Sequence, residues 1–431
     1  MKVDFAFGKS GLEATLPEGP EWLELRVKWA ESLADPVEAL EYALDNPIGS
    51  APLAELARGK RSAAISVCDI TRPAPNRTTL PLVLRRLAEA GIPKEETRIL
   101  IATGLHREAT PAELNEILGE EIASTYPIVN HNARNRDDHE WLGHTKSGTP
   151  VYVDKRYVSA DLHITLGFIE QHLMAGFSGG RKLIAPGVAF EETIRTLHSP
   201  RFMRDPRAVE GSIEENPLHK ELLEIAQLAG HDFALDVVLA EGRRIAGVFA
   251  GQPAEAHAAG VEFVRRQTTQ WIEGPVDAAV TTAAGYPLDL TFYQSVKGVT
   301  AASHLVRPGG IILVLAACDE GAGAGEFCRL LKESPDAGKF LKTISSTPVV
   351  IDQWQLEKLA LVCQTHRVWF YTPGLPVEYH ASLWGNIFPS ADAALAALAQ
   401  ETGPGKRVAV IPEGPYVFAR PRQSAAEPVP A

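Results

Sequence analysis

Residues 62–102 read SAAISVCDITRPAPNRTTLPLVLRRLAEAGIPKEETRILIA, and the fold class follows from this stretch. It contains an apolar, β-forming run at Ser62–Asp69, a helical pattern at Thr79–Ala90 and a second apolar run at Arg98–Ala102. A strand, a helix and a strand in this order are typical of a βαβ unit, whose parallel strands are covered by helices. The stretch therefore predicts a parallel sheet.

The same alternation continues on the C-terminal side of this unit. Thr110 is a predicted N-cap, with Pro111 at the first position of a helix over Pro111–Leu118. We expect further strands at Ile128–Asn130 and Leu162–Leu166. A hairpin of Asp236–Ala240 with Arg244–Ala250 and a helix over about Pro253–Gln267 complete the region.

A second α/β pattern begins after the polar, Gly- and Pro-containing piece Gln270–Pro275. Its predicted strands are Val276–Thr282, Gly310–Ala317, Pro348–Asp352, Val368–Tyr371 and Arg407–Pro412. The fold class expected is therefore α/β with two domains, each built around a mostly parallel sheet covered by helices.

The 431 residues suit two or three domains. We assign residues 1–270 to an N-terminal domain and residues 271–420 to a C-terminal domain, and residues 421–431 are expected to be a disordered tail. The active site is expected in the cleft between the two domains.

Charge and composition exclude several classes of function. The chain has 42 Lys+Arg and 54 Asp+Glu, a formal net charge of −12, so no overall basic field is available for nucleic acid or an anionic membrane. No stretch approaches 18 uninterrupted apolar residues. The four scattered cysteines resemble neither a disulfide framework nor a zinc ribbon, and reduced thiols in a cytoplasmic protein are expected.

Polar side chains follow three predicted strands of the first half. In open α/β sheets, ligands bind beyond the carboxyl ends of the strands, so these groups are expected at one rim. A lone histidine there is usually a loop residue, but three strand ends that all lead into polar and charged side chains favour a binding site. They are Asp69, Thr71 and Arg72 in DITRP, Thr103, Gly104, His106 and Arg107 in ATGLHR, and Glu170, Gln171 and His172 in GFIEQH.

A glycine-rich loop, LMAGFSGGRKLIAPG at residues 173–187, follows His172. Its closely spaced glycines are Gly176, Gly179 and Gly180, which would let the backbone approach an anionic ligand. Arg181 and Lys182 add cations. The spacing does not match a P-loop, and a tight turn with a surface lysine is the plainer interpretation. His198, at a predicted helix end in TLHSP, would by itself be structural.

In the second half, YPLDLTFYQSVKG at residues 286–298 is the informative segment. Gln294 and Lys297 are three residues apart and share one face of a helix, with Tyr293 beside them. Such a pair suits a small carboxylate, although it also occurs on ordinary surfaces. Trp354 in IDQWQ follows another predicted strand, and a core or interface tryptophan is the plain alternative to a ligand contact.

Taken together and in order, these motifs resemble the nickel-pincer lactate racemase family over nearly the whole chain. The motifs that carry the resemblance are DITRP, ATGLHR, GFIEQH, GFSGGRKLIAPG, TLHSP, YPLDLTFYQSVKG and DQW.

The resemblance implies a nickel-pincer nucleotide cofactor, a pyridinium mononucleotide with thioamide and thiocarboxylic acid groups whose sulfurs and a ring carbon hold nickel. Lys182 matches the lysine of the thioamide link, and His198 matches the nickel ligand of a square-planar site. The acid/base pair matches His106 and His172. Arg72, Asp69, Gly179 and Gly180 are expected at the cofactor, and the substrate residues are Arg72, Tyr293, Gln294, Lys297 and Trp354.

The resemblance also implies the reaction, which is inversion of C2 in a short 2-hydroxycarboxylate such as lactate. Direct deprotonation at C2 is difficult next to an ionised carboxylate. A base instead takes the hydroxyl proton while hydride leaves to the cofactor, and return of the hydride to the other face of the 2-ketoacid gives the antipode. Each enantiomer needs its own base, hence two histidines. The implied partners are the 2-hydroxycarboxylate and the cofactor-biosynthesis enzymes that load the protein.

Two other classes of function stay open from the residues. A zinc- or iron-dependent hydrolase or lyase would use His106, His172 and His198 as direct metal ligands and would not need Lys182. A non-enzymatic protein that binds a small carboxylate would use Arg72, Gln294 and Lys297 and would not need two histidines at strand ends.

Overall fold

The computed structural model describes residues 1–422 and divides the chain into two compact units. Unit 1 comprises Met1–Lys28, Ser199–Arg204 and the chain from Thr268 onward, and unit 2 comprises Trp29–His198 and Asp205–Gln267. The tail expected at 421–431 lies outside the described residues except for its first two, which belong to strand β20 (Ala419–Arg422).

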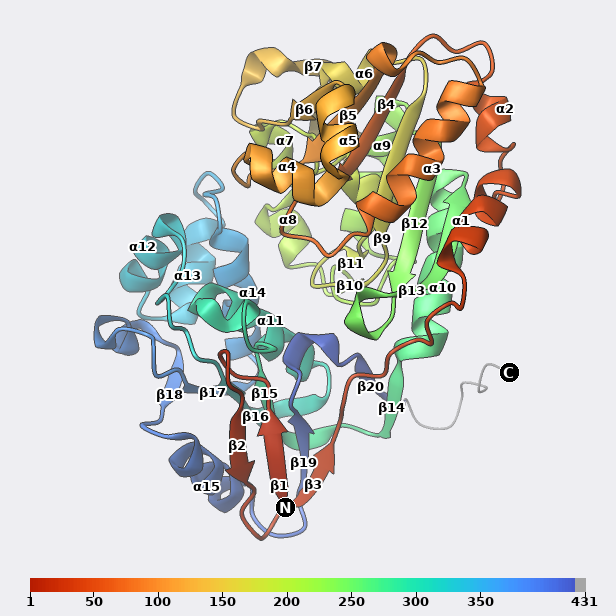
Figure 1. Ribbon diagram of the computed structural model, residues 1–431. Helices are drawn as coiled ribbons and strands as arrows, with labels where there is room; N and C mark the ends of the chain where they lie inside the picture. Colours follow the sequence, from red (N-terminus) through yellow and green to blue (C-terminus); the bar gives the residue numbers. More distant parts are fainter. Residues whose placement is uncertain (423–431) are drawn as a thin grey trace. The chain divides into compact units, whose positions relative to one another are not determined.

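Unit 2 is built on a six-stranded sheet in the order β13-β12-β9-β4-β5-β6, in which only β12 and β13 are antiparallel (Figure 1). The central strand β4 is buried along its whole length, as expected for a sheet covered on both faces. The strands are β4 (Ala63–Cys68), β5 (Thr97–Ala102), β6 (Ile128–Asn130), β9 (His163–Phe168), β12 (Phe233–Leu239) and β13 (Ile245–Gly251).

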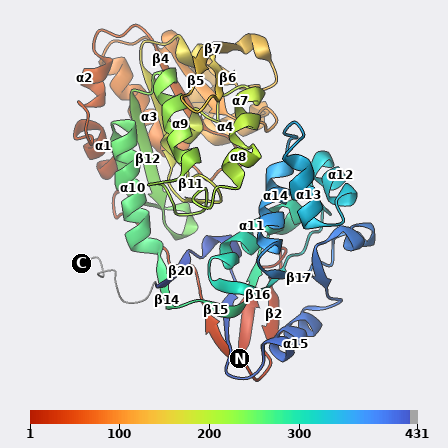
Figure 2. The ribbon, with the colours of Figure 1, turned by 180° about the vertical axis from the view of Figure 1, so that it is seen from behind.

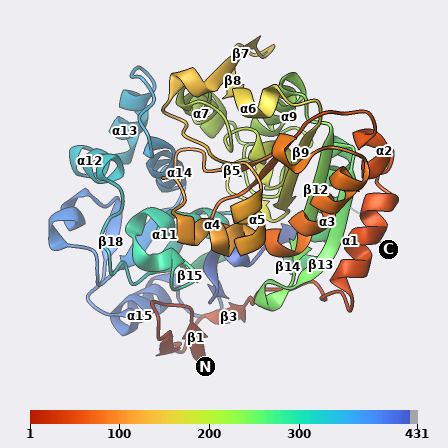
Figure 3. The ribbon, with the colours of Figure 1, turned by 45° about the horizontal axis from the view of Figure 1, so that its top comes forward.

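Helices cover both faces of this sheet. In Figures 1 and 3, α3 and α5 lie in front of the strands, and α9 and α10 are in front when the ribbon is seen from behind in Figure 2. The capping box predicted at Thr110 is present and begins α4. The helices are α1 (Pro36–Asp45), α2 (Leu53–Ala57), α3 (Asn76–Glu89), α4 (Pro111–Leu118), α5 (Glu120–Thr125), α6 (Lys155–Val158), α7 (Glu191–Leu197), α9 (Pro217–Ala229) and α10 (Pro253–Thr268).

Unit 1 contains a second six-stranded sheet, in the order β18-β17-β16-β15-β19-β3, and every pairing in it is parallel. Residues that alternate along its strands enter two different cores, so both faces are apolar. The strands are β3 (Glu21–Glu24), β15 (Val276–Thr282), β16 (Val306–Leu315), β17 (Arg367–Tyr371), β18 (Gly385–Ile387) and β19 (Arg407–Ile411).

One face of the second sheet packs against α11 to α14, and the other packs against α15 and the hairpin of β1 (Lys2–Phe5) with β2 (Leu12–Thr15). The short helix α8 (Pro200–Met203) also belongs to this unit. The helices are α11 (Phe292–Ser303), α12 (Gly325–Glu333), α13 (Ala337–Ile344), α14 (Gln353–Cys363) and α15 (Ala391–Thr402).

Four small two-stranded sheets are present besides the two large sheets in the described residues. The hairpin β1–β2 belongs to unit 1, and β14 pairs with β20 in parallel there. The remaining two are antiparallel and belong to unit 2. Their strands are β7 (His139–His144), β8 (Pro150–Asp154), β10 (Gln171–His172), β11 (Gly176–Phe177) and, in unit 1, β14 (Gln270–Glu273).

The expected fold class is confirmed, since both units are helix-covered, mostly parallel sheets. The partition differs from the expected continuous domain over 1–270. Strand β3 pairs with β19, which brings the N-terminal residues into unit 1, and α8 packs there as well. No helix in residues 1–422 is both long enough and apolar enough to cross a membrane.

One predicted strand is wrong. Residues Pro348–Asp352 form a loop in which Asp352 has a φ of 69° and leads into α14. The place beside β17 is taken by β18, which lies later in the chain. Trp354 therefore lies in the first turn of a helix, and its side chain is 8% exposed.

Gly298 controls the approach of α11 to the sheet. A Cβ atom at this position would lie 2.1 Å from the carbonyl oxygen of Thr282, at the end of β15. We expect Gly298→Ala to lower the free energy of unfolding by about 1–3 kcal/mol, the usual range for overpacking. Denaturant unfolding measures this loss. Gly325→Ala at the start of α12 is the control, because nothing lies within 4 Å of its added Cβ, and an equal loss there would contradict the explanation.

Candidate active site

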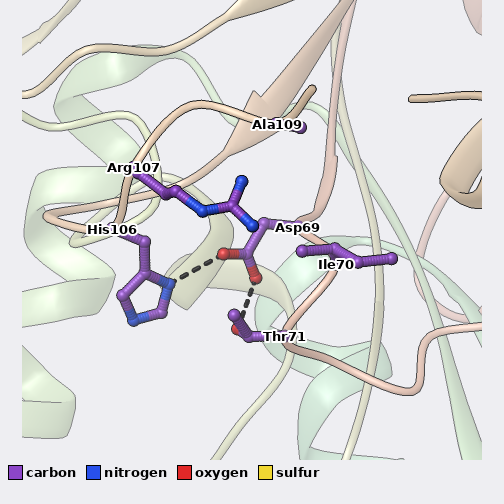
Figure 4. Close-up of a pocket in the computed structure, with 6 residues that line it drawn as sticks. All are labelled: Asp69, Ile70, Thr71, His106, Arg107 and Ala109. Carbon is purple, nitrogen blue, oxygen red and sulfur yellow. Dashed lines mark hydrogen bonds and ion pairs between the residues drawn. The ribbon is translucent and has the colours of Figure 1, made fainter. Parts of the chain in front are cut away.

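The carboxyl ends of β4 and β5 bring Asp69 and His106 together, as the sequence predicts. Asp69 Oδ2 lies 2.7 Å from His106 Nδ1, and Thr71 donates its hydroxyl hydrogen to Asp69 Oδ1 at 2.7 Å (Figure 4). These residues line a pocket of about 50 Å³ together with Ile70, Arg107 and Ala109. Because a carboxylate only accepts hydrogen bonds, Nδ1 carries the proton and Nε2 of a neutral ring offers a lone pair.

The carboxylate of Asp69 stays ionised although it is buried. Burial raises its pKa, but the hydrogen bonds from His106 and Thr71 and the charge of Arg72 outweigh this effect and hold the pKa below its usual value. The same carboxylate fixes the ring orientation of His106, whose side chain is 48% exposed. The pair is therefore an oriented base at the rim of the sheet.

Polar side chains on the second face of the same sheet hold the glycine-rich loop. Ser66 on β4 donates to the carbonyl oxygen of Leu183 at 2.8 Å, and Asp236 on β12 accepts from the amide of Gly180 at 3.1 Å. Both side chains are fully buried. Gly179 and Gly180 have φ values of 88° and 43°, a left-handed backbone that favours glycine. The sheet thus fixes the loop at two points, Gly180 and Leu183.

Arg181 is the centre of this loop and is 2% exposed. Its guanidinium donates to the carbonyl oxygens of Ala175, Phe177, Ser178 and Gly179 at 2.9–3.2 Å. Burial lowers its pKa to about 9. The sequence suggested Arg181 as a cation for an anionic ligand, but the structure uses its donors to fold the loop backbone around the side chain.

Lys182 follows Arg181 in the chain, but Lys182 is partly exposed whereas Arg181 is buried. Desolvation, followed by the charges of Arg181 and Arg72, lowers its pKa to about 7. A large fraction of the amine is therefore neutral at pH 7, and a neutral amine is the form that attacks a carbon electrophile.

His198 is the C-cap of α7, as expected. Its Nδ1 lies 2.8 Å from the carbonyl oxygen of Ile194, which only accepts, so Nδ1 carries the proton and Nε2 carries the lone pair. Desolvation lowers the pKa of His198 to about 4, and the charge of Lys182 acts in the same direction. A neutral imidazole with an oriented N–H is the usual form of a histidine metal ligand.

His172 lies on the small hairpin β10–β11 and is held in the other tautomer. Its Nδ1 accepts from the amides of Met174 and Ala175 at 3.3 and 3.2 Å, so the neutral ring carries its proton on Nε2. The two neutral rings therefore differ at Nε2, where His106 offers a lone pair and His172 offers an N–H.

The other predicted residues lie in unit 1. Gln294 and Lys297 share one face of α11, and Tyr293 packs edge-on against Phe327 with ring centroids 5.1 Å apart. Gln294 Oε1 is buried and has no hydrogen-bond partner among the described residues. A buried acceptor of this kind is rarely left unpaired, so a ligand group is a natural partner for it.

Electrostatic neighbours connect the unit 2 residues into one set. Arg72 influences the pKa of both Asp69 and Lys182, and Lys182 influences that of His198. Arg107 is different, since its guanidinium forms an exposed ion pair with Glu113 beside the α4 capping box. Arg107, which follows the second strand at the same rim, is therefore paired with Glu113 and not with another predicted site residue.

Sequence reasoning missed Ser66 and Asp236, which hold the loop. A signal exists for Asp236, because it is the one charged residue in the otherwise apolar strand FALDVVL. A buried carboxylate in such a strand requires a partner. For Ser66, a small residue of a buried strand, the sequence carries no comparable signal.

Two family models match this chain. The lactate racemase N-terminal domain matches residues 7–211, and the lactate racemase C-terminal domain matches residues 272–419. The chain belongs to the lactate racemase family. A lactate racemase of Thermoanaerobacterium thermosaccharolyticum is 36% identical over 97% of this chain and 99% of its own length. A lactate racemase of Lactiplantibacillus plantarum is 37% identical over 88% and 89%.

The fold agrees with that of a solved lactate racemase. The structure of the lactate racemase apoprotein from Thermoanaerobacterium thermosaccharolyticum superposes with a TM-score of 0.89 at 35% identity, covering 98% of this chain and 100% of that chain. A protein from Thermotoga maritima shares the fold at a TM-score of 0.66 and 17% identity. The family resemblance drawn from the ordered motifs is thereby confirmed.

The tautomer of His106 should depend on Asp69. In Asp69→Asn the charge that holds the proton on Nδ1 is lost, so we expect the population with a proton on Nε2 to rise. Nitrogen-15 NMR of the histidine ring in the protein without cofactor measures the two forms. Thr71→Val is the control, because it keeps the carboxylate. The same tautomer ratio in Asp69→Asn and the wild type would contradict the assigned orientation.

Proposed function

We propose that this protein is an isomerase, a 2-hydroxyacid racemase that inverts C2 of a short 2-hydroxycarboxylate with a nickel-pincer nucleotide. Lactate is the first candidate substrate, since the relatives described above are lactate racemases. The observation that carries the proposal is the state of Lys182, a lysine whose lowered pKa and glycine-rich loop leave a reactive amine in the neighbourhood of His198.

The residues present fit the proposed cofactor. Lys182 would hold the organic part through its amine, and His198 would hold nickel through Nε2. Arg72 suits the phosphate of a mononucleotide, whereas the amide of Gly180 is already paired with Asp236. When bound, the group supplies a carbon that takes hydride from the substrate and returns it.

The two histidines suit the proton transfers of a racemisation. The oriented lone pair of His106 takes the hydroxyl proton of one enantiomer. A second group must give a proton to the oxygen of the product. His172 can give its Nε2 proton only as an imidazolium, because a neutral ring would be left as an imidazolate, so this step would require His172 to be protonated and to give up its amide contacts at Nδ1. The roles exchange in the reverse direction.

Arg72, Gln294 and Lys297 would bind the substrate. A guanidinium can bind a carboxylate in a planar fork, and a lysine adds a second positive charge. The buried Oε1 of Gln294 suits a hydroxyl donor. Asp69 orients His106, and Tyr293 with Trp354 would contact the substrate's short side chain, which favours lactate over a dicarboxylate.

The two alternative functions find little support. A metallohydrolase would need three protein ligands close together, and no group of three or more His, Cys, Asp or Glu side chains in residues 1–422 is placed to hold a metal ion. His172 accepts from backbone amides at Nδ1, so its neutral ring carries a proton on Nε2 and has no free lone pair for a metal ion. A carboxylate-binding protein would have no use for the lowered pKa of Lys182.

We also propose that loading depends on the enzymes that make the cofactor. Protein co-expressed with them should carry a mass adduct on the peptide that contains Lys182, and Lys182→Ala should lack it. Because the pKa of Lys182 is about 7, an amine-selective reagent should modify the protein without cofactor with a midpoint near pH 7. Peptide mapping by mass spectrometry measures both. An adduct that persists in Lys182→Ala would overturn the assignment.

The decisive experiment combines nickel content with racemisation of D- and L-2-hydroxyacids. We expect racemisation of lactate by the loaded protein, and a fall in kcat of roughly 10²–10⁴-fold in His106→Ala or His172→Ala with nickel retained. His198→Ala should instead lose nickel. The opposite pattern of metal loss would favour direct ligation by His106 and His172, and a higher kcat/KM for malate would change the substrate.

A further inference from the structure

Helix α14 is buried on all sides, although four of its residues are polar. Gln353, Gln355, Glu357 and Lys358 are each between 0% and 5% exposed. Charged side chains are almost never buried this completely without partners. The contacts of Glu357 and Lys358 therefore show what this helix holds.

Both charged residues hold the segment 199–204, which contains α8. Glu357 Oε1 accepts from Arg204 Nε at 2.7 Å, and Lys358 donates to the carbonyl oxygen of Met203 at 2.9 Å. Arg204 also donates to Ser345 Oγ at 2.8 Å and to the carbonyl oxygen of Leu341 on α13. The end of α8 is thus fixed at four points, all within unit 1.

The position of residues 199–204 in the chain connects their contacts with α14 to the proposed nickel ligand. Residues 199–204 belong to unit 1, whereas the residues on either side of them belong to unit 2. The last residue of unit 2 before this excursion is His198, whose imidazole is the proposed nickel ligand. Whatever holds α8 therefore holds the segment joined directly to that imidazole.

The same helix also holds the start of the substrate helix. Gln355, two residues before Glu357, donates its side-chain amide to the carbonyl oxygen of Tyr293 at 3.0 Å. Tyr293 lies in the first turn of α11, next to Gln294. One turn of α14 therefore contacts both α8 and the residues proposed to bind substrate.

We propose that Glu357 and Lys358 are positioning residues for the racemase reaction, which hold His198 in place through Arg204 and the backbone of Met203. The inference rests on the proposed function, in which His198 binds nickel. Gln355 places the start of α11 from the same helix.

The ion pair of Arg204 with Glu357 is half-buried, since the side chain of Glu357 is fully buried and that of Arg204 is 32% exposed. Desolvation of the carboxylate offsets part of the attraction between the two charges, which favours positioning over a purely structural role. One oxygen of Glu357, Oε2, has no hydrogen-bond partner among the described residues, which adds to the desolvation penalty. The pair does supply direction, because Nε of Arg204 donates to a fixed oxygen.

The test replaces the pair without removing its volume. In the double variant Arg204→Met/Glu357→Met we expect the amides of Met203 and Arg204, which donate to the carbonyl oxygens of Ser199 and Pro200, to exchange hydrogen at least tenfold faster. Exchange in β16 should stay unchanged. Hydrogen exchange by mass spectrometry on the full chain without cofactor measures this effect, and unchanged exchange in α8 would overturn the proposal.

The loaded protein gives the second measurement. We expect the double variant to release nickel to a chelator roughly tenfold faster and to lose kcat while KM stays within about twofold, because Gln355 still holds Tyr293. Arg204→Lys, which keeps the charge, should recover most of both losses. Wild-type nickel release in the double variant would overturn the proposal.

Val362→Ala provides the matched control. Val362 is a buried apolar residue of the same helix with a side chain in the unit 1 core, so the variant destabilises α14 without changing the contacts to α8. Its nickel release should equal that of the wild type, and release as fast as in the double variant would overturn the proposal by indicating general destabilisation. His198→Ala separates the proposed function from the positioning role of Glu357 and Lys358. If it retains nickel, the proposed function fails, while hydrogen exchange in α8 still decides whether the contact holds the segment.

Discussion

The burial of Arg181 under the glycine-rich loop is the constraint on which the site in unit 2 depends. A guanidinium removed from water requires partners for its N–H groups, and Nη1 and Nη2 of Arg181 donate to carbonyl oxygens of residues 175–179, whereas Nε has no hydrogen-bond partner among the described residues. The backbone can curl around one side chain in this way because Gly179 and Gly180 adopt left-handed conformations. Lys182 follows Arg181 in this loop, and desolvation, together with the charges of Arg181 and Arg72, lowers its pKa.

Neutral nitrogen atoms are the common product of these surroundings. Desolvation leaves His198 uncharged near pH 7 and gives Lys182 a substantial neutral fraction there, and an ionised Asp69 keeps the proton of His106 on Nδ1. An amine for a covalent link, a metal ligand and a base all require a lone pair rather than a positive charge. The fold achieves this with backbone carbonyls and a single carboxylate, which explains why no cluster of three metal-binding side chains accompanies these residues within the described chain.

The sequence predicted the features that depend on local pattern. Parallel sheets bury both faces of each strand, so apolar runs such as AAISVC at Ala63–Cys68 are visible without a structure, and the polar groups after them mark the rim. The strand expected at Pro348–Asp352 failed because a short apolar run suits a half-buried loop equally well. Strand β3 was missed because its pairing with β19 joins residues almost 400 positions apart, which no local pattern records. The inward direction of Arg181 was missed for the same reason, since its partners are backbone carbonyls.

The polar sequence of helix α14 would predict an exposed helix, although the structure buries it. Its residues QWQLEKLALVC would usually place Gln, Glu and Lys on a solvated face, and yet the helix is buried all round. Three of its polar side chains form hydrogen bonds to specific neighbours, Gln355 to Tyr293, Glu357 to Arg204 and Lys358 to Met203. Apolar residues would fill the same space with less desolvation, but they would not define the direction of the two neighbouring segments. A polar helix in the interior is therefore better explained by the need to place α8 and α11 than by a gain in stability.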